Sequence, residues 1–467
     1  MTLGAWSPLE WLALVEHELL LFAGIFFIVG AADELAIDLT WIWLRLTGRA
    51  RAVPIPQETS HDGPLMGHAA VLIPAWREER VIAATIGHAL TVWPQAELRI
   101  YAGCYRNDSA TAEAVLAGGC GDPRLRLVIH DRDGPTTKAD CLNRLYAAME
   151  TDELRSGTRF RMIVLHDAED MVDPAALGLL DAALTQAEFV QLPVLPEPQR
   201  TSRWIGSHYC EEFAEAHGKA MVVRGELGAS LPAAGVGCAF NRDLLGAIAD
   251  DMRGSGPFSV DSLTEDYELG LKITAAGARS WFLRARRADG CLVATRACFP
   301  PTLRQAVTQK SRWIHGIALQ GWDRLGWSGG LAERWMRLRD RRGPLTALVL
   351  FAAYVLLVMA GILWLAGQFG YGRPWQPNAL LVTVLWINLA SFAWRVAMRF
   401  AFTTREYGMA EGIRAILRLP HANIISIMAG RRAFFAYVAT LLGAKLRWDK
   451  TPHHAHPADL LVSRHIA

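Results

Sequence analysis

Short apolar runs alternate with amphipathic segments through the first half of the chain. Runs of strand length lie at 69–73, 98–103, 125–129 and 160–165, and the segment 81–91 has a helical pattern. Strands that alternate with helices usually pair in parallel, and an open sheet of this kind binds ligands at the carboxyl ends of its strands. The pattern therefore predicts an α/β domain with a binding crevice at one sheet edge.

A longer apolar segment precedes this domain. Residues 11–32 have an uncharged core, long enough to cross a bilayer. No lysine or arginine comes before it, which favours a transmembrane helix over a cleaved signal peptide. Because Arg45, Arg49 and Arg51 follow the segment, the positive-inside rule places the amino terminus outside and the α/β domain in the cytoplasm.

Further apolar segments follow the domain. Residues 345–365 and 379–402 are of membrane-spanning length, and arginines between 334 and 342 precede the first of them, where they could contact anionic lipids. Residues 420–442 are split by two arginines, which favours a helix on the membrane surface over a fourth span. The predicted parts are an amino-terminal span (1–50), the α/β domain (65–300), interfacial helices (301–343), two spans (344–403) and a cytoplasmic helix with a tail (404–467).

Composition indicates a membrane component and argues against nucleic-acid binding. Of the 467 residues, 52% are hydrophobic, which is high for a soluble protein. The 48 basic and 46 acidic residues nearly cancel, leaving a net charge of +2. Seven cysteines are scattered without close pairs, which suits a reducing compartment. The histidine-rich tail lacks metal-ligand spacing and predicts a flexible polar segment.

Acidic residues follow the fourth predicted strand directly. Asp167, Glu169 and Asp170 come where a loop at the carboxyl edge of the sheet would lie. Divalent metals such as Mg²⁺ often bind one or two carboxylates together with the phosphates of a substrate. A solvated acidic turn that caps a helix near Pro174 explains the same pattern, so the acids alone leave both interpretations open.

Five motifs in order then resemble family 2 glycosyltransferases with the GT-A fold. Residues 73–78 (IPAWRE) are similar to the opening strand of that family, and 137–143 (TKADCLN) to its GKAxALN segment. Asp-Ala-Glu at 167–169 takes the place of the metal-binding DxD. Thr-Glu-Asp at 264–266 matches the TED that holds the catalytic base, and 309–313 match the QxxRW of processive members. The resemblance covers about residues 69–315 and implies a GT-A domain.

The resemblance also implies roles for single residues. A metal, Mg²⁺ or Mn²⁺, would bind Asp167 and Glu169, and Asp266 would be the base with Glu265 beside it. The nucleotide sugar would contact Pro74, Glu78, Asp108, Lys138, Asn143 and Gln191. Gly237, Gln309, Arg312 and Trp313 would serve the acceptor and the diphosphate. Five of these residues also have a plain interpretation: Lys138 as a surface lysine, Asp266 as an acid at a helix start, Gly237 as a tight turn, Gln191 as a polar strand end and Trp313 as part of an interfacial helix.

Two features depart from the family pattern. Glu169 replaces the second aspartate of DxD, and Asp170 could take over its role. The second strand lacks the usual pair of acids, so that Asp108 is the candidate there. The His-Asp-Ala-Glu-Asp run at 166–170 and the tail 448–457 resemble a narrower group of inner-membrane glycosyltransferases, the phage adsorption B proteins. That resemblance implies an outer-membrane partner and a surface exopolysaccharide.

The sequence thus predicts a bacterial inner-membrane, metal-dependent, inverting glycosyltransferase that adds sugars from a UDP-sugar to a growing glycan. Its expected partners are the nucleotide sugar, the glycan, membrane lipids and either an outer-membrane protein or further copies of the chain. Two alternatives stay open: a transferase of single sugars to a lipid-linked acceptor, and a non-catalytic membrane scaffold.

Overall fold

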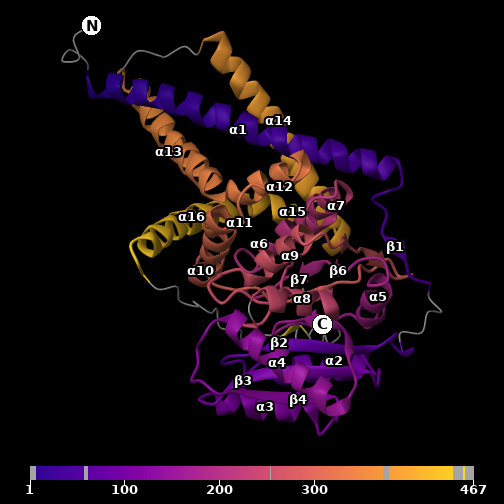
Figure 1. Ribbon diagram of the computed structural model, residues 1–467. Coiled ribbons are helices and arrows are strands. Elements are labelled where there is room, and N and C mark those ends of the chain that lie inside the picture. The colour runs from indigo at the N-terminus through magenta and orange to yellow at the C-terminus, as the bar shows by residue number, and fades with distance from the viewer. Residues whose placement is uncertain (1–6, 57–61, 253, 372–377, 445–455, 458–467) are drawn as a thin grey trace.

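A seven-stranded mixed sheet forms the centre of the α/β domain in the computed structural model, which describes residues 7–56, 62–252, 254–371, 378–444 and 456–457 (Figure 1). Its strand order is β4-β3-β2-β5-β8-β6-β9. The four predicted strands pair in parallel, as expected. They are β2 (His68–Pro74), β3 (Leu98–Tyr105), β4 (Leu125–His130) and β5 (Phe160–Leu165).

The other half of the sheet is built from shorter strands. β8 (Cys238–Asn241) runs antiparallel between β5 and β6 (Phe189–Gln191), and β9 (Ser280–Phe282) is parallel to β6. Two small parallel pairs flank the sheet: β1 (Val53–Pro54) with β10 (Ala285–Arg286), and β7 (Val194–Pro196) with β11 (Thr295–Ala297). The reversal at β8 brings the loop before it to the carboxyl ends of β2 and β5.

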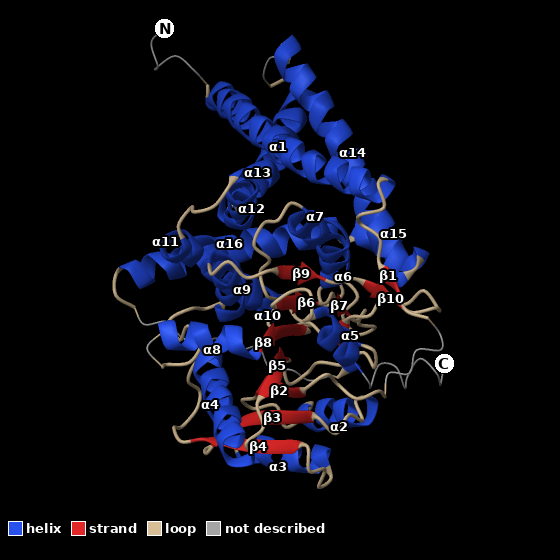
Figure 2. Ribbon diagram, turned by 45° about the vertical axis from the view of Figure 1, so that its right-hand side comes forward, coloured by secondary structure: helices blue, strands red, loops and turns tan. Residues whose placement is uncertain are grey.

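Helices cover both faces of the sheet. Val71 and Leu72 of β2 point to opposite faces and are both buried, as expected for a parallel strand between two helical layers. Figure 2 shows α4 and α8 on one side of the strands and α2 and α5 on the other. The first side holds α4 (Lys138–Ser156), α8 (Arg242–Asp251) and α9 (Glu265–Ala275), and the second holds α2 (Ile82–Val92), α3 (Ser109–Gly119) and α5 (Ala176–Ala183).

Within the described part of the chain, four helices are long and apolar enough to cross a membrane: α1 (Pro8–Leu46), α13 (Gly343–Gln368), α14 (Ala379–Tyr407) and α16 (Leu419–Leu441). The first three form one group in which α1 packs against both α13 and α14 (Figure 1). Shorter helices join this group to the sheet. They are α6 (His208–Glu215), α7 (Met221–Glu226), α10 (Leu303–Trp313), α11 (Gly321–Leu325), α12 (Leu331–Arg341) and α15 (Met409–Leu417), with π-helical segments η1 (Ala216–Ala220) and η2 (Ile314–Gln320).

α16 lies between α13 and the α/β domain. It packs against α10 and η2, and Ile425 is buried in the same apolar cluster as Val307. Two polar contacts join it to the domain: Arg432 Nη1 donates to Thr308 Oγ1 at 2.7 Å, and Tyr437 OH donates to Asp323 Oδ2 at 2.6 Å. Its length and composition qualify it as a fourth candidate span, and its position on the membrane surface stays a prediction.

A buried network of ion pairs joins α1 to the rest of the protein. Asp38 of α1 is fully buried and accepts hydrogen bonds from Lys219 Nζ and Trp394 Nε1. Lys219 Nζ also lies 2.7 Å from Glu215 Oε1. Arg395 Nη2 lies 2.8 Å from the same Glu215 oxygen, so that two cations face the two acids. The network is therefore tolerated away from water, and it holds α1 against η1 and α14.

The predicted lipid contact of the arginine cluster at 334–342 is wrong for most of its members. Arg339 and Arg342 pair with Asp33 and Glu34 of α1. Arg337 and Arg341 are buried within the protein. The sequence could not show this because the acids lie some 300 residues away, on another helix.

Lys219→Met should lower the free energy of unfolding by about 3–5 kcal/mol, because it leaves Asp38 buried without its main cation. Chemical denaturation of the purified protein in detergent would measure this loss. Arg159→Met is the matched control, since Arg159 forms an exposed pair with Asp243 and should change stability little. Equal stability of the parent and Lys219→Met would show that the network does not hold α1 in place.

Candidate active site

The carboxyl ends of β2 and β3 are joined through Asp108. Pro74 ends β2, and Arg77 in the following loop has a positive φ of 53°. Asp108 Oδ2 accepts a hydrogen bond from the Arg77 backbone N–H at 2.6 Å, which stabilises this unusual conformation. Glu78 is buried, and its N–H donates to Thr111 Oγ1 at 2.9 Å. The predicted residues Pro74, Glu78 and Asp108 therefore shape one wall of the crevice.

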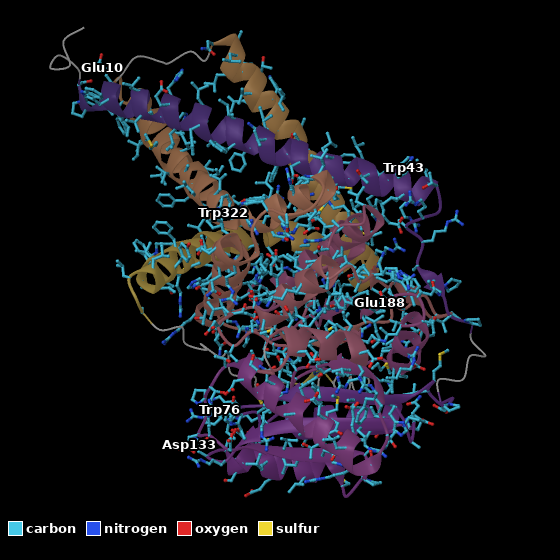
Figure 3. The ribbon with its side chains drawn as sticks, in the orientation of Figure 1. Glu10, Trp43, Trp76, Asp133, Glu188 and Trp322 are labelled. Atoms are coloured by element: carbon cyan, nitrogen blue, oxygen red, sulfur yellow. The ribbon has the colours of Figure 1, made fainter. Side chains whose placement is uncertain are left out.

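Aromatic side chains lie at the same edge. Trp76 packs edge-on against Tyr105, with 5.2 Å between ring centroids, and Tyr105 stacks on His130 at 5.1 Å. The Arg77 guanidinium lies over the Trp76 ring at 5.1 Å. Figure 3 shows Trp76 close to Asp133, at the edge of the sheet.

The loop after β5 carries Asp167 and Glu169, and the side chain of Asp170 stabilises its turn. Asp170 Oδ2 accepts the Asp167 backbone N–H at 2.8 Å and faces His166 Nδ1 at 3.0 Å. Asp170 and His166 are buried, whereas Asp167 and Glu169 are half-buried. Asp170 therefore supports the loop from behind, and the structure does not favour the alternative in which it replaces Glu169 as a ligand.

Lys138 meets Asp167 across the crevice. It is the first residue of α4, whose N-cap Thr137 accepts the Asp140 N–H at 3.1 Å. Lys138 Nζ lies 2.6 Å from Asp167 Oδ1. Asp167, Glu265 and Asp266 raise the pKa of Lys138 against the effect of its burial, so the lysine stays charged. The plain interpretation of Lys138 as a surface lysine is therefore wrong.

Glu265 and Asp266 open α9 and face Lys138 and Arg312. Burial and the neighbouring Asp266 together raise the pKa of Glu265 to about 7, and Lys138 opposes them. Burial also raises the pKa of Asp266, with Lys138 as the main opposing charge. Asp266 Oδ1 accepts its neighbour's backbone N–H, that of Tyr267, at 2.8 Å. Two adjacent carboxyls with raised pKa values are typical of an acid–base site.

The backbone at Gly235 lies close to the side chains of Asp266 and Lys138. Its φ is +74°, and a Cβ at this position would collide with the Asp266 carboxylate and lie 3.3 Å from Lys138 Nζ. Only glycine combines this backbone conformation with so little space. The glycine-rich loop before β8 therefore forms one side of the site.

Gln191 holds that glycine-rich loop. The side chain is fully buried, and Nε2 donates to the carbonyls of Leu192 at 2.8 Å and Val236 at 2.9 Å. Its Oε1 accepts the Ala234 N–H at 2.8 Å. Gly237, with φ +60°, bonds through its N–H to the Leu165 carbonyl at 3.0 Å. Gln191 and Gly237 thus position the loop, and their direct contact with a sugar stays a prediction.

Asn143 supports another loop of the site. Its Nδ2 donates to the Phe258 carbonyl at 2.8 Å, and its Oδ1 accepts the Phe258 N–H at 3.0 Å. It lines a second groove between α4 and the end of α8, separate from the pocket that Lys138 lines. The pair of bonds fixes the segment that leads to Glu265.

Asn143→Ala should lower the free energy of unfolding by about 1–3 kcal/mol, because two buried backbone groups lose their partner. We expect the KM for a donor to stay nearly unchanged, since the side chain is already used within the protein. Thermal unfolding and donor titration of the same preparations would measure both. A large rise in KM without loss of stability would show instead that Asn143 binds the sugar donor, as the sequence predicted.

One pocket brings five of the predicted site residues together: Lys138, Glu265, Asp266, Arg312 and Trp313. The other predicted residues do not line it. Three separate segments line it: the start of α4, the loop into α9 and the end of α10. Its lining residues are Thr137, Lys138, Val260, Ser262, Leu263, Thr264, Glu265, Asp266, Arg312 and Trp313. The wall at 260–263 carried no motif and escaped sequence analysis.

The end of α10 lines the mouth of this pocket. Trp313 packs against Tyr209, Phe213 and Phe299, with centroid distances of 6.0 to 6.3 Å, so its ring is held in place. Gln309 lies one turn earlier on the same helix, outside the pocket lining. Directly after Trp313 the helix widens into η2, where Gly316 lies against Thr264. The π-helical turn therefore fits the QxxRW helix against the loop that carries Glu265 and Asp266.

The carboxyl-terminal region also reaches the site. His456 is fully buried, and its Nε2 lies 3.3 Å from the Asp170 carbonyl oxygen. The prediction of a flexible tail is therefore wrong for His456. The other tail histidines lie outside the described residues.

The donor set suits a divalent cation bound together with phosphates. Among the described residues no group of three or more His, Cys, Asp or Glu side chains could hold a metal on its own. Asp167 instead has a single cation beside it, the Lys138 ammonium, and Glu169 is half-buried in the same loop. One or two carboxylates completed by substrate oxygens are the usual ligands of Mg²⁺, so these residues fit such an ion.

Comparisons with known proteins agree with this geometry. Bacteriophage adsorption protein B of Escherichia coli K12 is 32% identical over 95% of this chain, and the N4 adsorption protein B of E. coli O157:H7 is equally similar. The chain spans about 62% of the length of each.

Solved structures resemble it more distantly. A mannosyltransferase from Pyrobaculum calidifontis in complex with GDP-mannose and Mn²⁺ aligns with a TM-score of 0.49 at 16% identity, over 88% of this chain and 98% of its own. Glucosyl-3-phosphoglycerate synthase of Mycobacterium tuberculosis aligns with a TM-score of 0.28 at 18% identity, over 48% of this chain and 73% of its own.

The family assignment rests on the sequence of the catalytic domain. Residues 67–316 match the model of the family described as "Glycosyltransferase like family 2". This match begins just before β2 and ends within η2, and so contains every pocket-lining segment described above. Because this match covers more than half of the chain, the chain belongs to glycosyltransferase family 2.

Proposed function

We propose that this protein transfers sugars from a nucleotide-diphosphate sugar, with inversion, to a growing cell-surface polysaccharide. The observation that carries the proposal is the single pocket in which Lys138, Asp266 and Trp313 meet from three segments of the chain. A base, fixed positive charge and an aromatic platform are the parts that a sugar transfer needs. A protein without catalysis would have no physical need to bring them together.

The chain's own groups account for the main chemical demands. Asp266 is placed to accept the proton of an acceptor hydroxyl, and burial keeps its pKa high enough to hold that proton. Lys138 and Arg312 supply fixed positive charge for the diphosphate leaving group. A divalent metal, Mg²⁺ or Mn²⁺, on Asp167 and Glu169 would add Lewis-acid stabilisation of that group.

The acceptor side supports repeated transfer. Trp313 is held by three aromatic neighbours at the mouth of the pocket, where its face could stack on a sugar ring. α10, which carries it, packs against α16 and so adjoins the apolar helices. We infer that the glycan leaves toward the membrane, with the catalytic domain in the cytoplasm and the amino terminus in the periplasm.

Activity should rise with pH through about 7. The raised pKa values mean that Glu265, at about 7, and Asp266 are partly protonated in mild acid. A protonated carboxyl cannot act as a base, and the pKa of Asp266 is raised above that of an ordinary aspartate, so kcat/KM should fall as the pH is lowered. Protonation of the neighbouring Glu265, near pH 7, should contribute to the same fall. A pH profile of nucleotide release would measure this. A flat profile from pH 5.5 to 8 would contradict the base assignment.

The experiment that tests the function is nucleotide-diphosphate release by the purified protein across a panel of UDP- and GDP-sugars, with Mg²⁺, Mn²⁺ or EDTA. Metal-dependent release with one donor, together with a polymeric product, would support the proposal. A product with one added sugar on a lipid would favour the single-sugar transferase. Nucleotide binding without turnover of any donor, with a glycan primer and the membrane lipids supplied, would favour the scaffold.

A further inference from the structure

Three arginines converge on one glutamate where the apolar helices meet the catalytic domain. Glu406, near the end of α14, accepts a hydrogen bond from Arg286 Nη2. The same oxygen, Oε1, lies 3.4 Å from Arg284 Nη2 and 3.9 Å from Arg405 Nε. Arg284 and Arg286 belong to the segment that follows β9, on the catalytic domain. Figure 2 shows β10 below the lower end of α14, beside α15.

A fourth arginine adds to this positive charge. Burial, together with the charges of Arg405, Arg286 and Arg45, lowers the pKa of Arg284 to about 10, and Glu406 opposes this. Arg45 lies in the last turn of α1, two residues after Trp43, which Figure 3 labels at that end of the helix. Glu406 is the single acid that pairs with Arg284, Arg286 or Arg405 among the described residues. The cluster therefore holds an excess of positive charge.

Two of these guanidinium groups also have unused donors. The Nε–H groups of Arg284 and Arg286 are buried and have no hydrogen-bond acceptor among the residues that the structure describes. Arg284 is only 7% exposed. Buried charge that is unbalanced and buried donors that are unpaired are both costly, and native proteins usually compensate them with an ion or an acceptor. Both features point to an anion with several oxygen atoms.

We propose that Arg45, Arg284, Arg286 and Arg405 form a binding site for a phosphate-bearing anion, here called the arginine site. Planar guanidinium groups match phosphate oxygens in pairs and are the preferred protein ligands for them. The site joins the ends of α1 and α14 to β10. An anion there would stabilise the docking of the catalytic domain on the apolar helices. The phosphate could belong to an anionic lipid head group or to a soluble compound, because both present the same oxygens.

A Glu406→Gln variant distinguishes an anion-binding site from a set of ion pairs that only ties the helices to the domain. If Glu406 only ties the helices to the domain, Glu406→Gln should destabilise the protein, and phosphate should have no effect on either form. If the arginine site binds an anion, removal of its one carboxylate should strengthen phosphate binding, because the carboxylate competes for the same donors. Phosphate should then restore much of the stability that Glu406→Gln loses.

The test uses the full chain and two probes. In the first arm, inorganic phosphate is titrated into detergent-purified protein at constant ionic strength, and thermal unfolding reports binding. In the second arm, the protein is reconstituted in phosphatidylcholine vesicles with or without phosphatidylglycerol, and its thermal unfolding is compared between the two. Arg405→Gln is the main variant, since Arg405 is partly exposed and its loss should be tolerated. Arg279→Gln, in an exposed pair with Glu188, is the control.

We expect saturable stabilisation by at least one probe, weakened about tenfold or more in Arg405→Gln and unchanged in Arg279→Gln. Stabilisation by free phosphate would identify a soluble ligand, and stabilisation by phosphatidylglycerol alone would identify a lipid head group. The proposal is overturned if neither probe stabilises the parent protein, or if Arg405→Gln and Arg279→Gln respond alike.

Discussion

Asp266→Asn should lower kcat/KM for sugar transfer by about a thousandfold, because loss of a positioned general base typically costs 10²–10⁴ in rate. The amide keeps the size of the side chain but cannot take the acceptor proton. Donor binding should survive, since Lys138 and Arg312 remain in the pocket. Nucleotide release under donor saturation, beside donor titration by calorimetry, would separate the two effects.

Asp261→Asn is the matched control for this variant. Asp261 lies in the same loop, five positions earlier, and its side chain is exposed. It should leave kcat within the error of the parent. If Asp266→Asn retained most of its activity while Glu265→Gln lost it, the base would be Glu265 instead.

Asp167→Asn should reduce kcat/KM by about 10²–10³, the usual effect of removing one group that stabilises charge in the transition state. Two changes combine. A neutral amide is a poor ligand for a divalent metal. It also leaves Lys138 without its partner at 2.6 Å, so that the ammonium is free to move. The readout is the Mg²⁺ or Mn²⁺ concentration that gives half-maximal rate, which should rise.

Asp243→Asn controls for loss of a carboxylate in general. Asp243 pairs with Arg159 on the surface, with both side chains mostly exposed, and should change neither rate nor metal response. An Asp167→Asn enzyme with normal metal dependence would show that Asp167 acts only through Lys138.

The fold could be predicted in part because its signals are local. Val71 and Leu72 are adjacent apolar residues on opposite faces of β2, and both are buried. That pattern already indicates a parallel strand between two helical layers. The strand that ends at Gln191, β6, was expected, but β8 and β9 were not. β9 is three residues long and pairs only with β6 among the described strands, and a run that short has no readable period.

The site, like the fold, could be predicted only in part. Lys138, Asp266, Arg312 and Trp313 were identified from motifs, and the structure brings them into one pocket. Gln191 and Asn143 were assigned to the nucleotide sugar, yet their amides hold the backbones of Val236 and Phe258.

The partners of those amides are carbonyl and N–H groups, which every residue carries. The sequence therefore offers no sign of such a bond.

The sequence by itself determined the kind of protein: four parallel strands, apolar helices on both sides and a family 2 set of polar residues in order. These follow from hydrophobic periodicity and residue chemistry, which are local properties of the chain. The tertiary structure alone decided which charges meet. Asp38 pairs with Lys219, and Glu406 pairs with Arg286. Helix packing and strand register bring these distant segments within a few ångströms of each other, and no local sequence pattern specifies such distances.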